Sequence, residues 1–153
     1  MKKKKRLLII FGTFFFLISI CYLFVRDNRL YDRDKPNIFE IPGTATDITI
    51  NRVRYLERCY MVQKVPNNND DIKSMISDYI SEKNLVKDLF SNGIDYVILK
   101  FYSPSMNLPV YFEENKSYYK MDDFIDHYTE NLILQVWFDE VYSEGEYVFH
   151  DND

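Results

Sequence analysis

The feature that most constrains this chain is an uncharged apolar stretch near its start. Residues Leu7 to Val25 read LLIIFGTFFFLISICYLFV, and five cations, Lys2 to Arg6, come directly before them. A helix of this length would reach about 28 Å, close to the ~30 Å hydrocarbon core of a bilayer. A helix also satisfies its own backbone hydrogen bonds in lipid. The stretch therefore predicts a single-pass transmembrane helix, residues 7–25, that contacts the lipid bilayer as an uncleaved signal anchor.

Two other interpretations of this stretch are disfavoured by the residues at its end. A cleaved signal peptide would close with small residues in an A-x-A-like site, whereas this stretch closes with Tyr22-Leu23-Phe24-Val25-Arg26. Lipid attachment at Cys21 would need its own signal, and a bulky Ile20 stands in front of that cysteine. Cleavage and lipidation remain the minor alternatives.

The flanking charges predict the orientation of the anchor. The five cations of Lys2 to Arg6 are contiguous, whereas the four that follow the stretch are spread out: Arg26, Arg29, Arg33 and Lys35. Cytoplasmic flanks carry the excess of Lys and Arg. We therefore expect a cytoplasmic amino terminus and a main domain outside the cytoplasmic membrane, which places the protein in the cell membrane.

The remainder of the chain is long enough for one compact domain and too short for two. Pro36 and Pro42 lie in a charged segment without hydrophobic periodicity, which indicates an extended juxtamembrane linker. The predicted division is a basic leader at 1–6, the anchor at 7–25, the linker at 26–46, an α+β extracytoplasmic domain at 47–150 and a polar tail at 151–153.

The soluble part contains one long helical pattern. Apolar residues recur at helical spacing from Asp70 to Asn92, with Lys83 as the one polar gap in the stripe. Asn68 or Asn69 can cap the amino end, and Gly93 is a natural stop at the carboxyl end. The sequence therefore predicts a helix over 70–92 whose apolar stripe packs on a sheet.

Several apolar or alternating segments predict strands. A shift in alternation near Asn51 predicts a bend or bulge there. Gly145 is expected to supply the special dihedral of a hairpin connection. The predicted strands are 47–55, 60–65, 94–102, 110–112, 117–121, 132–138, 141–142 and 147–149, with a helical turn at 122–128. The fold class is therefore α+β: a long helix packed on a mostly antiparallel sheet of four to six strands.

The charge distribution argues against nucleic acid as a partner. Residues 26–153 hold 14 of the 19 cations and all 24 acids, so the domain lacks the basic footprint that such binding needs. Residues 121–153 contain ten acids and neither Lys nor Arg. An arginine from the first strand, Arg52, Arg54 or Arg58, could offset them. We therefore expect at least one of these arginines to pair with an acid among Asp139, Glu140, Glu144 and Glu146.

The sequence offers one weak candidate for a metal or catalytic site. Asp122, Asp123, Asp126 and His127 are close enough on a helical turn for carboxylates and an imidazole to converge. A short amphipathic turn with a solvated acidic face explains the same residues, and this interpretation is favoured. The four glycines are isolated, so no phosphate-binding loop is present, and no cofactor or metal is expected.

These observations favour a non-enzymatic interaction or assembly module tethered outside the membrane, with a basic surface of another envelope protein as its partner. One alternative is a small hydrolase or metal-dependent enzyme that uses the Asp/His cluster around 122–127. Another is a cell-wall or sugar-binding module, which would need exposed coplanar aromatic rings. We expect Trp137 to lie in the core, and Cys59 to be a buried structural thiol in a strand.

Overall fold

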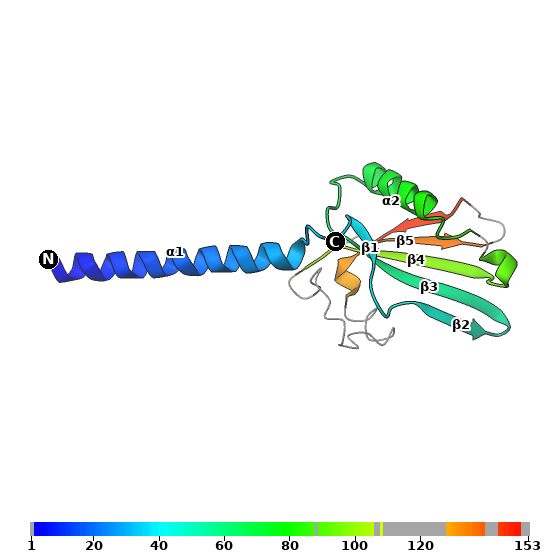
Figure 1. Cartoon of the computed structure of the whole chain (residues 1–153), viewed down its shortest axis with the longest axis horizontal. Coiled ribbons are helices and arrows are strands. Elements are labelled where there is room, and N and C mark those ends of the chain that lie inside the picture. The colour runs from blue at the N-terminus through cyan, green and yellow to red at the C-terminus, as the bar shows by residue number, and fades with distance from the viewer. Residues whose placement is uncertain (1, 88, 106–107, 109–127, 140–143, 151–153) are drawn as a thin grey trace.

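The computed structural model describes residues 2–87, 89–105, 108, 128–139 and 144–150, and within the first helix the side chains of residues 11–25 and 30. In this part of the chain the fold is α+β, with two α-helices and a mixed six-stranded sheet. Helix α1 (Lys2–Leu30) extends away from the sheet, and helix α2 (Asn69–Lys83) lies on one face of it (Figure 1). Among the described residues, no helix combines the length and the apolarity that crossing a membrane requires.

The sheet is ordered β1-β3-β4-β5-β6, and β2 also pairs with β3. Strand β3 is ten residues long, so one of its edges accommodates β2 along its first half and β1 along its last three residues. All pairings are antiparallel except that of β3 with β4. The strands are β1 (Ile38–Glu40), β2 (Thr46–Ile50), β3 (Val53–Val62), β4 (Tyr96–Tyr102), β5 (Leu132–Phe138) and β6 (Glu146–Phe149).

The parallel pair β3–β4 is the centre of the fold. Parallel neighbours need a crossover, and α2 supplies it between the end of β3 and the start of β4. The strand expected over 94–102 is confirmed as β4, which is buried on both faces. The strands after the helix, β4, β5 and β6, pair antiparallel as expected.

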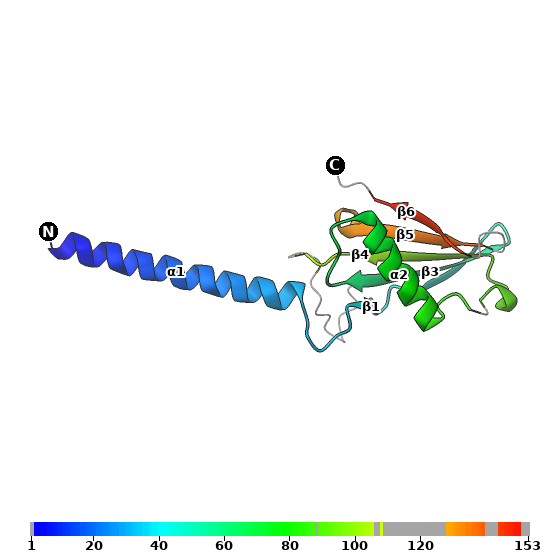
Figure 2. The same cartoon turned by 90° about the horizontal axis from the view of Figure 1, so that it is seen from above.

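Helix α2 packs its isoleucines on what we call the helix face of the sheet. Ile72, Ile76 and Ile80 are its buried residues, and they belong to one apolar cluster with the sheet. Figure 2 shows that α2 crosses the strands obliquely. The strands contribute alternate residues to this core: Leu56, Tyr60, Val62, Val97, Leu99, Phe101, Leu134, Val136 and Phe138.

Both ends of α2 are set by asparagines. The side chain of Asn68 accepts a hydrogen bond from the Asp71 N–H at 2.8 Å, which confirms the expected amino-terminal cap. The expected carboxyl end at Asn92 is wrong, because the helix stops at Lys83. Asn84 takes a left-handed conformation with φ 51°, and its N–H closes on the carbonyl groups of the last turn. The polar gap at Lys83 therefore marks the end of the helix.

On the opposite side of the sheet, which we call the second face, the described residues form a buried cluster only at the end nearer α1. There Ile41, Cys59, Met61 and Tyr102 form a second apolar cluster with Leu108 and Leu132. At the other end of this face Ile48 and Ile50 of β2 are 45% and 52% exposed. The two ends of the second face therefore differ in character, and the end far from α1 presents apolar side chains to solvent.

The segment that joins α1 to the sheet is tied to the end of β3 by Gln63. This side chain is buried, accepts a hydrogen bond from the Asp32 N–H at 2.6 Å and donates one to the Pro36 carbonyl at 2.8 Å. Asn37 accepts a further bond from the Lys64 N–H at 2.8 Å. The range 26–46, predicted to be a linker, thus contains the end of α1, strand β1 and buried contacts with the domain.

Strands β2 and β3 form a tight hairpin where a bulge or bend was expected. Ile50 pairs with Val53, so only Asn51 and Arg52 connect the strands. Both have positive φ, 53° and 71°, as a type I′ turn requires. Asparagine tolerates this conformation, whereas arginine at the second position carries the cost of a side chain in the left-handed region.

Replacing Arg52 with glycine should therefore stabilise the domain by about 0.5–1 kcal/mol, because relief of backbone strain exceeds the added entropy of the unfolded chain. The measurement is the urea midpoint of the full chain in detergent. Arg52→Ala removes the same charge and keeps the Cβ atom, so it should give no comparable gain. Equal midpoints for the glycine and alanine variants would contradict the strain at this turn.

Candidate functional site

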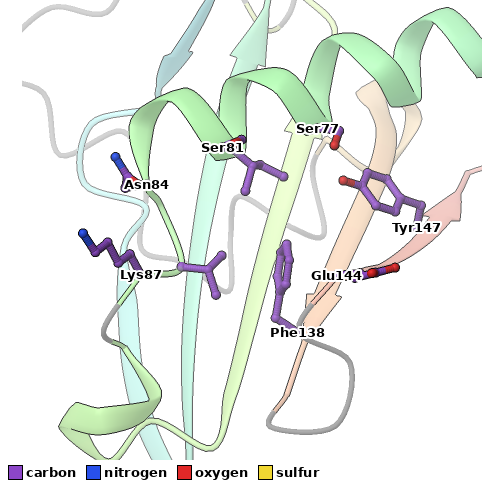
Figure 3. Close-up of a pocket in the computed structure, with 9 residues that line it drawn as sticks. Ser77, Ser81, Asn84, Lys87, Phe138, Glu144 and Tyr147 are labelled. Atoms are coloured by element: carbon purple, nitrogen blue, oxygen red, sulfur yellow. The ribbon is translucent and has the colours of Figure 1, made fainter.

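A shallow groove of about 280 Å³ lies between the second half of α2 and the end of the sheet formed by β5 and β6. Phe138 stands in the middle of it, and Tyr147 directs its hydroxyl from β6 towards Ser77 on α2 (Figure 3). Its other lining residues are Ile80, Ser81, Asn84, Val86, Lys87 and Glu144. The groove has an apolar floor with polar groups around its rim, a composition that suits a side chain of a partner.

The groove exists because of two local features of the backbone. Helix α2 ends at Asn84, where the chain turns away, and Phe138 lines the groove beyond this point although it is only 4% exposed. Gly145 precedes β6 with φ 82°, and a Cβ atom there would lie 2.7 Å from Cε1 of Phe138. Glycine is therefore required both by the backbone conformation and by the close approach to the ring, and the dihedral expected of Gly145 is confirmed.

The ring of Tyr147 on β6 makes a cation–π contact with a lysine of helix α2. Lys73 from α2 lies with its ammonium 5.0 Å from the centre of the Tyr147 ring. Such a cation–π contact at a partly exposed site contributes about 0.5–1 kcal/mol. Glu144 and Glu146 flank this region and are both exposed. Of the charged residues in this region, Lys87 and Glu144 line the groove itself.

A second group of polar residues lies on the second face, at the centre of the sheet. Lys100 of β4 places its ammonium 2.5 Å from Oε1 of Glu57 on β3, and the two side chains are 11% and 18% exposed. Although that oxygen has no partner at hydrogen-bonding geometry among the described residues, the separation is that of a close ion pair. An ion pair this far removed from water persists only because each charge offsets the other.

Cys59 lies beside this ion pair and is fully buried, so the expectation of a buried thiol in a strand is confirmed. Burial, with a smaller effect of the Glu57 charge, raises the pKa of the Cys59 thiol to about 12. Burial likewise raises the pKa of the Tyr102 hydroxyl, which lies next to the thiol. A nucleophilic cysteine needs a depressed pKa and access to solvent, and Cys59 has neither.

The sequence-predicted metal or catalytic residues lie outside the described part of the chain. This applies to Asp122, Asp123, Asp126 and His127, and to the strands expected at 110–112, 117–121 and 141–142. Within the described ranges no three side chains of His, Cys, Asp or Glu come together as metal ligands. The relative positions of the four side chains of this candidate site are therefore outside what the structure describes.

The position of Trp137 differs from the expectation. It alternates with the buried residues of β5, so its ring falls on the second face and is 38% exposed. Ile98 on β4 and Glu146 on β6 are its cross-strand neighbours. The period of two in Leu134, Val136 and Phe138 fixes this outcome, because all three face α2.

Two arginines of β3 form ion pairs with acids on the neighbouring strands β2 and β1. Arg54 forms a two-pronged pair with Asp47 of β2 at 2.6 and 2.9 Å, and Arg58 lies 3.7 Å from Glu40 of β1. Strands β4 and β5 separate β3 from β6. The expected pairing with the acidic end required these strands to be neighbours, and the topology contradicts that condition.

The groove was missed by sequence reasoning because its residues come from three separate segments. Ser77 and Ser81 look like the polar side of a helix, and Glu144 looks like a turn residue. The signal that could have pointed to this region is the alternation in Glu146 to Phe149, which marks a strand with one half-buried side. Comparison with known proteins adds no candidate, since no family model, curated protein or solved structure matches the chain.

The high pKa of Cys59 predicts a pH dependence of stability. Its thiol stays protonated in the folded state up to about pH 12, whereas the unfolded thiol ionises near pH 9.0. Stability from this group is therefore complete below pH 9 and is lost as pH rises towards 12. Between those values the wild type should lose about 1.4 kcal/mol per pH unit more than Cys59→Ala does.

Urea unfolding of both chains at several pH values from 8 to 11 measures this difference. Tyr60 contributes equally to the two chains. Because Cys59 itself helps to raise the pKa of Tyr102, both chains carry Tyr102→Phe in this comparison. The alanine cavity shifts the Cys59→Ala curve by a constant. Parallel curves would mean that the folded protein does not hold the thiol proton.

Proposed function

We propose that this protein is a membrane-tethered interaction module without enzymatic activity, with residues 7–25 in the bilayer. The main support for the proposal is the exposure of helix α1, in which every side chain from Phe11 to Val25 is exposed. Phe15 and Phe24 are 70% and 68% exposed. A helix that is apolar on all sides needs an apolar environment around it, and its length suits a bilayer.

The occupant of this helix surface is taken to be lipid for three reasons. The apolar residues surround the helix and do not form one stripe, as a contact with a single partner helix would require. The stretch is bounded by the cations of Lys2 to Arg6 on one side and by Arg26 on the other. The contiguous cations before the stretch are also typical of the cytoplasmic flank of a span, and they favour a sheet domain outside the cytoplasmic membrane.

The role as an interaction module is supported by the surfaces of the domain. The Glu57–Lys100 ion pair and the buried thiol of Cys59 lie within the sheet and do not line the groove. The groove and the exposed end of the second face offer apolar surface instead. The partner we propose is another envelope protein with a basic surface, because the acids of the chain outnumber its cations after residue 25.

A cell-wall polysaccharide is the second candidate ligand, and the exposed ring of Trp137 is the observation in its favour. Tyr55 and Tyr96 lie on the same face but stack on each other at 5.2 Å, with 14° between their rings. Each tyrosine ring therefore has one of its faces covered by the other ring. The ring of Trp137 is then the main surface on which a sugar could stack. A hydrolase built on Asp122, Asp123, Asp126 and His127 stays an alternative without described geometry.

Tethering by α1 predicts a clear result in membrane extraction. At alkaline pH in carbonate, the wild-type chain should stay with the membrane pellet, because its anchor is integral. A variant with Leu17→Arg and Ile18→Arg should move to the soluble fraction, since each charge costs about 2.5–3.5 kcal/mol at the centre of a span.

The matched control is Leu17→Ile with Ile18→Leu, which keeps the apolar volume and should behave as the wild type. Release of the wild-type chain by carbonate, with the domain still folded, would contradict the proposed membrane anchor.

A further inference from the structure

Strand β6 is an edge of the sheet with hydrogen-bonding groups that no described residue uses. The N–H of His150 donates to the carbonyl of Ile133 at 3.1 Å, and these residues continue the register of β5 and β6. In an antiparallel pair such bonded positions alternate with unbonded ones. The N–H and C=O groups of Tyr147 and Phe149 therefore point away from β5, towards an edge where none of the described strands pairs with them.

The side chains of β6 give this edge two different faces. Tyr147 and Phe149 are half-buried on the helix face, where they pack against the main core. Glu146 and Val148 are exposed on the second face. A strand added beside β6 would therefore meet aromatic rings on one side, and a carboxylate and a valine on the other.

The groove extends the helix-face side of this edge. Tyr147 belongs both to β6 and to the groove lining, so a side chain placed beside Tyr147 lies next to the space between Phe138 and α2. In Figure 3 the groove opens between the helix and this tyrosine. An apolar residue of an added strand would bury itself there against the rings, which adds side-chain specificity to the backbone hydrogen bonds.

The charges around the edge select the partner. Glu144 and Glu146 come just before Tyr147, and residues 121–153 carry no Lys or Arg of their own. Two cations lie near this edge: Lys73 of α2 is placed over the Tyr147 ring, and Lys87, from the segment after α2, lines the groove. A cation on the second-face side of an added strand would lie opposite Glu146, where a cross-strand pair of opposite charge is favourable.

We propose that β6 and the adjoining groove bind an extended segment of a partner protein by strand addition, with apolar residues facing Tyr147 and Phe149 and Lys or Arg facing Glu146. This rests on the proposed role as an interaction module and names the chemistry of its partner.

A second copy of the chain is the less suitable occupant. Two identical β6 strands that continue one sheet in antiparallel fashion are related by a twofold axis perpendicular to the sheet. Helix α1 leaves the domain roughly along the strand direction (Figure 2), so the two stalks would point in opposite directions. Because Gln63 ties the segment after α1 to β3, that arrangement does not suit two chains anchored in one membrane.

The test uses the full chain in lipid nanodiscs and the acetylated, amidated peptide Lys-Phe-Lys-Val-Lys-Phe. Trp137 is the only tryptophan and pairs with Glu146, so its fluorescence reports binding at this edge. Peptide binding should slow the hydrogen exchange of the Tyr147 and Phe149 amides. The same peptide N-methylated at alternate residues keeps its charge but loses the donors, and should bind at least about tenfold more weakly.

Two variants of the protein separate the contribution of the Tyr147 backbone N–H from that of its side chain. Tyr147→Pro removes the outward N–H, which does not serve the ladder to β5, whereas Tyr147→Ala removes the same ring and keeps the N–H. The proline variant should bind at least about threefold more weakly than the alanine variant, the loss expected for one hydrogen bond. Glu146→Gln should also weaken binding, and the loss should shrink as salt concentration rises.

Binding that tolerates N-methylation, or that is equal in the proline and alanine variants, would overturn strand addition, as would no binding of the peptide. A concentration-dependent dimer of the chain that Tyr147→Pro abolishes would overturn the partner in favour of a second copy. Carbonate extraction measures the anchor separately. A chain that stays in the membrane but ignores the peptide would refute this inference alone.

Discussion

The parallel pairing of β3 with β4 is the interaction on which the rest of the domain depends. A parallel pair cannot be closed by a short turn, so the chain between the two strands must cross over the sheet, and α2 is the element that does so. Burial of Ile72, Ile76 and Ile80 on the helix face follows from that crossover. Because β3 is longer than its neighbours, its other edge holds both β1 and β2, and β6 is left as the far edge of the sheet.

The same long strand couples the domain to the helix that precedes it. Gln63 follows β3 directly and bonds to the backbone at Asp32 and Pro36, so the segment between α1 and β1 has buried partners. A glutamine buried this deeply is stable only because both ends of its amide are satisfied. If α1 is anchored as we propose, this coupling sets the direction in which the sheet leaves the membrane. The groove and β6 would then keep a defined orientation, which suits capture of a partner at the envelope.

How far the sequence predicts this structure varies with the kind of signal. Strand β4 could be predicted because a strand buried on both faces appears in the sequence as one apolar run. Helix α2 could be predicted from the helical spacing of its isoleucines. The end of α2 at Asn84 depends on a left-handed residue that is not glycine, and the tight turn at Asn51 and Arg52 lacks the usual glycine. Trp137 was misplaced because large aromatic rings suggest a core, although the period of β5 puts it on the second face. The groove was not predictable, because it depends on how far α2 extends over β5 and β6 and not on any local motif.

The central claim is that the sheet domain stands outside the cytoplasmic membrane on a stalk formed by α1. The most direct test fuses, after Asp153, a reporter enzyme that is active only outside the cytoplasm. A cytoplasm-active reporter at the same position is the matched control. The account predicts activity from the first fusion and little from the second, because the cations of Lys2 to Arg6 retain the amino terminus inside. The opposite pattern, with both fusions well expressed, would place the domain in the cytoplasm and contradict the account.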